Sequence, residues 1–143
     1  MTLLLSAKIN KSIAIGRSAM ASSVSNQGTI VIGYYAGDHA SADVDNAVII
    51  GREAGRGAMT SGADGTVAIG YQAGTAITSG QRNVLMGYQA GLSMTTMDDT
   101  VAIGYGAGDA LSTGTGRNTI IGGAAASDLT TESQNVAIGS SAL

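Results

Sequence analysis

The sequence contains no cysteine, no proline, no phenylalanine and no tryptophan. The absence of cysteine excludes disulfide scaffolds, thiolate metal sites and cysteine nucleophiles. The absence of proline leaves the backbone N–H groups available for a hydrogen-bond ladder, which favours long and regular sheets. Because a rounded globule of 143 residues would normally bury several large aromatic rings, an aromatic content of only five tyrosines indicates a thin core.

Charged residues are also scarce, at 12% of the chain, and they sum to a net charge of −3. The seven lysines and arginines are scattered, so we expect no binding of nucleic acid and no basic stripe for anionic lipid. No apolar run approaches the ~18 residues of a membrane-spanning helix, and the opening MTLLLSAKINK lacks the basic region of a secretion leader. We therefore expect neither membrane insertion nor export through a standard cleaved leader.

What the chain has instead is a repeat that runs through nearly all of it. Eight blocks of the type Val-x-Ile-Gly-x-x-Ala-Gly are anchored on the glycines Gly16, Gly33, Gly51, Gly70, Gly87, Gly104, Gly122 and Gly139. The spacings between these anchoring glycines are 17, 18, 19, 17, 17, 18 and 17 residues. A near-constant period of this length is typical of a solenoid, in which each repeat stacks on its neighbours.

Each block begins with a three-residue β-type run, such as 67–69, and its anchoring glycine then opens a turn. A second apolar position follows the turn, as at Ile77 and Met94, with alanine there in the second and third rungs. The sequence therefore predicts an all-β chain, a parallel β-solenoid of about eight rungs of 17–19 residues, each composed of strand, turn, short strand and turn. Residues 13–143 form the repeat domain, and residues 1–12 form an N-terminal docking or capping segment.

The middle position of the three-residue run predicts an oligomer. Successive side chains of a strand point to opposite faces, and the middle position is apolar in every rung, so both faces require burial. A single chain covers one face and leaves the other as an exposed apolar stripe. We assign the stripe to the middle position and expect a homotrimer, although a dimer satisfies the same argument. The predicted interface residues are Ala14, Val31, Ile49, Ala68, Leu85, Ala102, Ile120 and Ala137.

The blocks VAIGYQAG (67–74), VAIGYGAG (101–108) and NVAIGSSAL (135–143) resemble the repeats of trimeric autotransporter adhesin heads and the related repeats of bacteriophage tail fibres. The resemblance extends over about residues 12–143. It implies a left-handed parallel β-roll, three chains that are intertwined or side by side, and attachment to a host surface. The period of 17–19 residues exceeds the about fourteen of the adhesin-head repeat and is closer to that of the phage fibres.

This resemblance favours a non-catalytic fibre or decoration protein of a bacteriophage virion, with the N-terminal segment docked onto another virion protein. Because residues 1–143 contain no pattern of an anchor barrel, a coiled-coil stalk or a leader, we expect the chain not to be a complete autotransporter. The alternative is the head fragment of a trimeric adhesin on a bacterial cell surface. A third interpretation is a hexapeptide-type acyltransferase, because Ile-Gly-x-x-Ala also resembles the motif of that family.

Candidate catalytic and metal-binding residues are confined to one polar segment. Acyltransferases of the hexapeptide family use a histidine as general base, and His39 is the one histidine of the sequence. We predict that it is a solvated loop residue and that the chain is not an enzyme. Asp38, Asp43 and Asp45 offer oxygen ligands of the type that Ca²⁺ prefers. The segment lacks the Gly-Gly-x-Gly-x-Asp pattern of calcium-binding β-rolls, so we expect no metal and no cofactor.

Four of the five tyrosines directly follow an anchoring glycine: Tyr34, Tyr71, Tyr88 and Tyr105. Stacking of consecutive rungs should bring the last three into an aromatic ladder. Such a ladder is suited to packing against the turn or another chain, which we favour, or to binding the sugar rings of a host-surface glycan. An ice-binding array of Thr66 and Thr100 is a remote alternative, because asparagine takes their place in other rungs.

Overall fold

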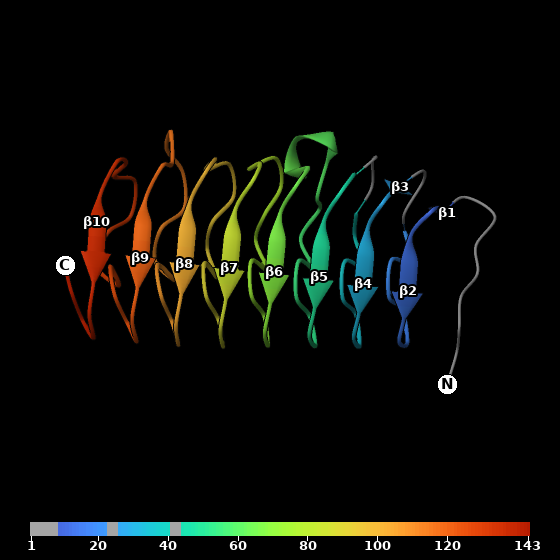
Figure 1. Ribbon diagram of the computed structural model, residues 1–143, viewed down its shortest axis with the longest axis horizontal. Helices are drawn as coiled ribbons and strands as arrows, with labels where there is room; N and C mark the ends of the chain where they lie inside the picture. The colour runs from blue at the N-terminus through green and yellow to red at the C-terminus, as the bar shows by residue number, and fades with distance from the viewer. Residues whose placement is uncertain (1–8, 23–25, 41–43) are drawn as a thin grey trace.

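Eight three-residue strands stack into one parallel sheet that runs the length of the chain (Figure 1). The strands are β2 (Ile13–Ile15), β4 (Ile30–Ile32), β5 (Val48–Ile50), β6 (Val67–Ile69), β7 (Val84–Met86), β8 (Val101–Ile103), β9 (Thr119–Ile121) and β10 (Val136–Ile138). This computed structural model describes residues 9–22, 26–40 and 44–143. They form a parallel β-solenoid of about seven turns with rungs of about 17 residues, which confirms the predicted class of fold.

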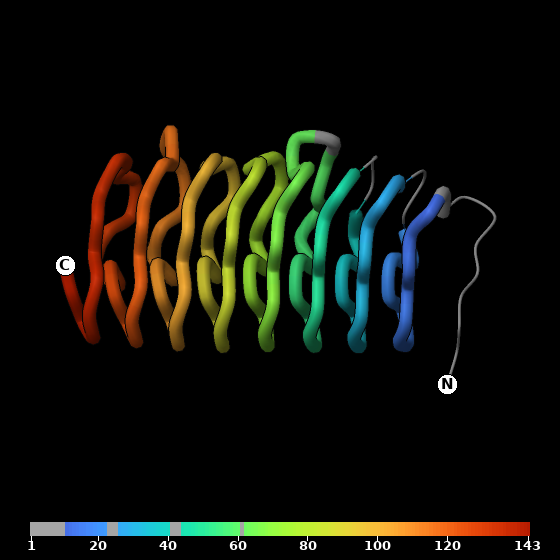
Figure 2. Tube along the Cα trace, in the orientation of Figure 1, coloured from blue at the N-terminus to red at the C-terminus, as the bar shows by residue number. Residues whose placement is uncertain are grey.

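The strands pair without any shift between rungs. The middle residue of β6, Ala68, lies opposite Ile49 of β5 on one side and opposite Leu85 of β7 on the other. Figure 2 shows the successive turns side by side, with the first and last of the described turns at opposite ends of the rod. Because the register is constant, each position of the repeat becomes a column of side chains along the rod axis.

The anchoring glycines are required by the close approach of neighbouring turns. Their φ angles lie between 126° and 145°, in a region that L side chains rarely adopt. A Cβ atom at Gly70 would overlap the carbonyl oxygen of Gly87 in the next rung. The same glycine donates its N–H to the carbonyl oxygen of Ile50 in the preceding rung, at 2.8 Å. Glycine therefore permits the turns to stack at the spacing of the sheet.

The core of the solenoid is a narrow column of small and medium side chains. Middle strand residues such as Leu85 pack with the alanine of the block, here Ala90, and with the second apolar position, as at Ile77 and Met94. In the third rung, which is one or two residues longer than the others, the buried residue is Met59, whereas Ala58 is exposed. The prediction of alanine at that position is therefore wrong for this rung.

The segment that leads from the turn after one strand to the start of the next strand, which we call the return leg of the rung, is not a regular strand. We had predicted a second short strand there. The return leg still hydrogen bonds from rung to rung, since the N–H of Thr95 donates to the carbonyl oxygen of Ser112 at 2.8 Å. The described residues contain one further pair of strands, β1 (Ile9–Asn10) with β3 (Asn26–Gln27), and one 3-10 turn, η1 (Ser61–Ala63). Among these residues, the structure has no helix long and apolar enough to cross a membrane.

A mostly polar column closes the rungs just before the strands, with Ala47 as the one apolar member among the described rungs. The side-chain oxygen of Asn83 accepts from the N–H of Thr100 at 2.9 Å, and its amide donates to the carbonyl oxygen of Met97 at 2.7 Å. Two rungs further on, Asn118 makes the equivalent bonds to the backbone of Asn135 and of Glu132. A buried amide without partners would cost about 1–3 kcal/mol, so these bonds fix both the turn and the register.

Glycines that contact the next rung and glycines that face open space should respond differently to substitution, which tests the stacking argument. We expect Gly87→Ala to destabilise the fold by at least about 3 kcal/mol, because its Cβ would overlap the backbone of Gly104 and its φ is +137°. Gly123→Ala is the matched control, since a Cβ there meets nothing within 4 Å, and its effect should stay within about 0.5 kcal/mol. Thermal and denaturant unfolding followed by circular dichroism measures both, and equal effects would contradict the argument.

Candidate functional site

The residues that we predicted as the oligomer interface lie inside the single chain. All eight middle strand residues are buried, and the most exposed of them, Ala14, has only 6% of its surface accessible. Their side chains point into the coil, against the return leg of the rung. A side chain that is covered by its own chain cannot contact a partner, so the predicted assignment of the two faces is wrong and has to be reversed.

The physical reason is that strand alternation defines two faces without saying which one the coil encloses. Both faces are apolar in this chain, so hydropathy alone does not distinguish them. Side-chain size distinguishes the two faces. The middle position mixes alanine with Leu85, Ile49 and Ile120, as expected where each residue must fit the volume left by the return leg. The flanking positions are almost uniformly valine or isoleucine, as expected on an open, regular surface.

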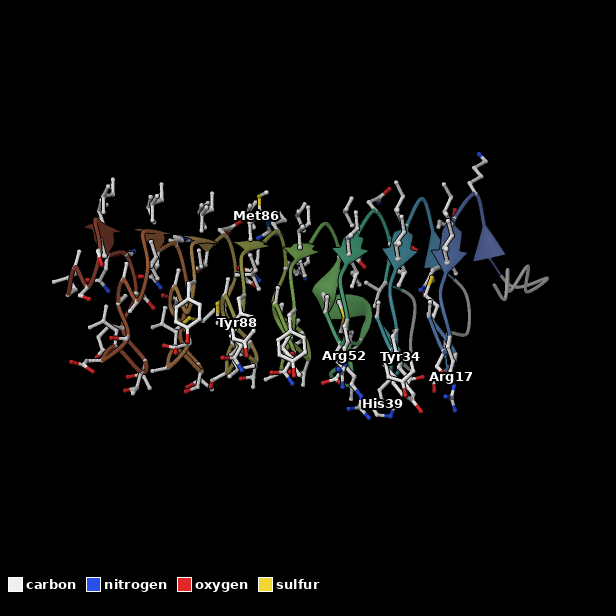
Figure 3. All side chains as sticks on the ribbon, turned by 90° about the horizontal axis from the view of Figure 1, so that it is seen from below. Arg17, Tyr34, His39, Arg52, Met86 and Tyr88 are labelled. Carbon is white, nitrogen blue, oxygen red and sulfur yellow. The ribbon has the colours of Figure 1, made fainter. Side chains whose placement is uncertain are left out.

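The apolar surface that the single chain leaves uncovered is the outer sheet face, formed by the first and third residues of the eight strands β2 and β4–β10. It comprises Ile13, Ile15, Ile30, Ile32, Val48, Ile50, Val67, Ile69, Val84, Met86, Val101, Ile103, Thr119, Ile121, Val136 and Ile138. None of these residues is charged, and all are half-buried or exposed in the single chain. Figure 3 shows Met86 on this face, pointing away from the turn that carries Tyr88 and Arg52. The structure therefore has a continuous apolar surface two residues wide.

A second column, which we call the ring ladder, runs along the turn after the strands (Figure 3). It consists of the residues that follow the first six anchoring glycines: Arg17, Tyr34, Arg52, Tyr71, Tyr88 and Tyr105. The ring centroids of Tyr71 and Tyr88 are 5.0 Å apart, and those of Tyr88 and Tyr105 are 5.3 Å apart with an interplanar angle of 15°. The predicted aromatic ladder is confirmed as a geometric arrangement.

The arginines of the ring ladder were missed by the sequence reasoning, which followed tyrosine alone. The guanidinium of Arg52 lies 5.8 Å from the ring centroid of Tyr34 and 5.7 Å from that of Tyr71. Arg17 covers the other side of Tyr34 at 5.7 Å. These cation–π contacts continue the stack through the first rungs. The shared repeat position was the signal that could have identified them.

A hydrogen-bonded chain of polar side chains lies beside the ring ladder. The amide of Gln89 donates to Gln72 at 2.9 Å, and the amide of Gln72 donates to the carboxylate of Glu53 at 2.9 Å. The bond from Gln72, together with the charge of Arg52, holds the pKa of Glu53 below its usual range. These three residues adopt the left-handed backbone conformation, with φ of 54–58°, and their side chains help to hold the turn together.

The candidate catalytic and metal ligands are not brought together. The side chain of His39 is 55% exposed, and its nearest charged partner is the Asp38 carboxylate at 3.7 Å. The carboxylate of Asp45 accepts the backbone N–H of Gln27 at 2.8 Å and so serves the turn. Asp43 lies outside the described residues, among which no three histidine, cysteine, aspartate or glutamate side chains form a group fit for a metal ion.

The structure also shows where the two threonines of the ice-binding interpretation lie. Thr66 and Thr100, which the ice-binding interpretation required at the surface, are buried in the polar column before the strand. They therefore cannot form an exposed array.

An ion pair links neighbouring rungs at the second turn of the rung, which is the turn that leads into the strand. The guanidinium of Arg82 donates two hydrogen bonds to the carboxylate of Asp99 in the next rung, at 2.6 and 3.0 Å. This pair is exposed to solvent and links neighbouring rungs at the surface.

The Arg82–Asp99 pair predicts a pH effect. Its hydrogen bonds lower the pKa of Asp99, so its contribution to stability is present above the ordinary pKa of an aspartic acid and is lost as pH falls through the lowered pKa. Arg82→Gln should raise the pKa of Asp99 and reduce this loss. Arg117→Gln, which removes only a weaker charge effect, should move the pKa less. Carboxyl NMR titration measures both, and equal shifts would contradict the assignment.

Comparison with known proteins does not assign the chain to a family. A scan against protein-family models gives no match, and searches of curated proteins and of solved structures give none either. The argument for function therefore depends on the two surfaces described above, the outer sheet face and the ring ladder.

Proposed function

We propose that this chain is a non-catalytic, homotrimeric fibre or decoration protein of a bacteriophage virion. The observation that carries the proposal is the outer sheet face, whose sixteen positions contain fourteen valines and isoleucines and no charged residue. A soluble protein rarely leaves an apolar surface of this length in water. Burial against further copies of the same chain removes it from water and produces a longer, stiffer rod.

The geometry of the outer sheet face suits association between identical chains. Its two columns are straight and in constant register, so copies aligned along the rod axis present the same rows to one another. The β-branched side chains lose little rotamer freedom when they are packed, because their χ1 angles are already restricted. Polar and charged residues, such as Arg82 and Asp99, lie at the second turn and would form the rim of the interface.

The choice of three copies and of a phage virion rests on the resemblance of the blocks, such as VAIGYQAG at 67–74, to the repeats of phage fibres and adhesin heads. In a three-sided arrangement the outer sheet faces meet at the centre, and the turns face outward. The N-terminal segment, residues 1–12, would then dock onto another virion protein. Residues 1–8 of that segment lie outside the described residues. The rod would serve attachment of the particle or decoration of its surface.

The two faces of the strand predict opposite outcomes for matched pairs of substitutions. Ile69→Asp with Ile103→Asp places charges on the outer sheet face and should convert the oligomer into folded monomers, at a cost of about 2 kcal/mol or more per charge in the interface. Ala68→Asp with Ala102→Asp buries charges inside the coil and should prevent folding.

Light scattering coupled to gel filtration and circular dichroism distinguish these results. The unchanged protein should have the mass of three chains, and a mass of two chains would replace the trimer by a dimer. An unaltered mass for the pair Ile69→Asp and Ile103→Asp would remove the outer sheet face from the interface and sink the proposal.

A further inference from the structure

The ring ladder ends abruptly at Tyr105. Each of the earlier rings has a neighbour on both sides: Tyr34 lies between two arginines, Tyr71 between Arg52 and Tyr88, and Tyr88 between two rings. Tyr105 stacks on Tyr88 alone, because the next rung carries Gly123 at the same position. Its exposed fraction of 67% is the largest among the ladder tyrosines, compared with 47% for Tyr88 and 38% for Tyr34. One aromatic face is therefore open.

The space beside that face is not required by the backbone. A Cβ atom built on Gly123 meets nothing within 4 Å, and its φ lies outside the positive region that the anchoring glycines occupy. The ladder position beyond it carries Ser140, which is exposed and small. Two rungs span about 9.6 Å, so the space between Tyr105 and Ser140 has room for one ring stacked at the spacing of the ladder. We call this space the step. Glycine at position 123 therefore leaves open space where a Cβ atom would lie.

A carboxylate lies in the same turn as Tyr105. The carboxylate of Asp109 lies beside Gly106, the residue that follows Tyr105, with Oδ2 3.4 Å from the position of a Cβ there. An ionised carboxylate accepts hydrogen bonds from two neighbouring hydroxyl groups. The arginines of the ladder, Arg17 and Arg52, lie three or more rungs away, so the charge at this end favours a neutral ligand over an anion.

We propose that the step beside Tyr105 binds one pyranose ring of a neutral glycan. The apolar C–H face of the sugar stacks on the open face of Tyr105 in place of the missing side chain, and ring hydroxyls donate to Asp109. The site deepens the attachment role proposed above and rests on it for its biological purpose. The ring ladder lies on the side of the rod away from the outer sheet face (Figure 3), so assembly through that face leaves the step accessible.

The test uses the full chain and a panel of methyl glycosides of glucose, galactose, mannose and N-acetylglucosamine, with methyl glucuronide as the anionic comparison. Saturation-transfer NMR and titration of the tyrosine ring signals detect weak binding. We expect at least one neutral glycoside to bind, with a Kd of about a millimolar, and methyl glucuronide to bind more weakly. The strongest binder of the panel is then used with the variants.

Gly123→Tyr extends the ring ladder into the step and should weaken binding by about tenfold or more, as should Tyr105→Ala. Tyr105→Phe keeps the ring face and should bind within about twofold of the unchanged protein. Tyr34→Ala is the matched control, because that ring is covered on both sides by arginine and offers no open face.

Undiminished binding by Gly123→Tyr, or the absence of binding by every neutral glycoside, would overturn the proposal. Binding of p-cresol without any glycoside would assign the step to an aromatic side chain of a protein and would overturn it as well. Light scattering on the same samples reports the oligomer separately, so failure of the sugar site is distinguishable from failure of the proposed fibre.

Discussion

The close approach of backbone to backbone at the anchoring glycines is the constraint on which the rest of the structure depends. From Gly16 to Gly122 these glycines leave no space for a side chain, and from Gly33 to Gly139 each donates a hydrogen bond to the preceding rung, as Gly70 does to Ile50. Contact of this kind fixes the register of every pair of turns. Constant register in turn converts each repeat position into a column. A short block of sequence therefore determines four features of the rod: the core, the polar column, the outer sheet face and the ring ladder.

The sequence predicted the rungs, the turns and the stacking of the tyrosines, because these follow from the period of the repeat. It did not predict which face of the strand is enclosed, since Ala68 inside and Ile69 outside are both apolar. Side-chain volume, rather than hydropathy, separates the two columns. The return leg was also beyond prediction, because its length varies and a longer rung substitutes Met59 for the expected alanine without disturbing the strand.

The outer sheet face and the ring ladder differ in chemical character. The outer sheet face is uniform and apolar, which suits the proposed contact with copies of the same chain, whereas the ring ladder is amphipathic and lies on another side of the rod. Because every rung follows the same pattern, a departure from it is easy to recognise. Gly123 is such a departure, since it interrupts the ladder where no backbone constraint demands a glycine. In a repeat protein, a position that breaks a column without structural need is a place to look for function.

Thiol accessibility tests the central claim, which is that the middle column faces the core and the flanking column faces a partner chain. The chain has no cysteine, so Leu85→Cys, Met86→Cys and Thr113→Cys each introduce a single thiol, at a core, an outer-face and an exposed loop position. In the native protein the first two should react with a thiol reagent far more slowly than the third. Fast reaction of the Met86→Cys thiol, at the rate of the Thr113→Cys thiol, would show that the outer sheet face is open to water and would contradict the account.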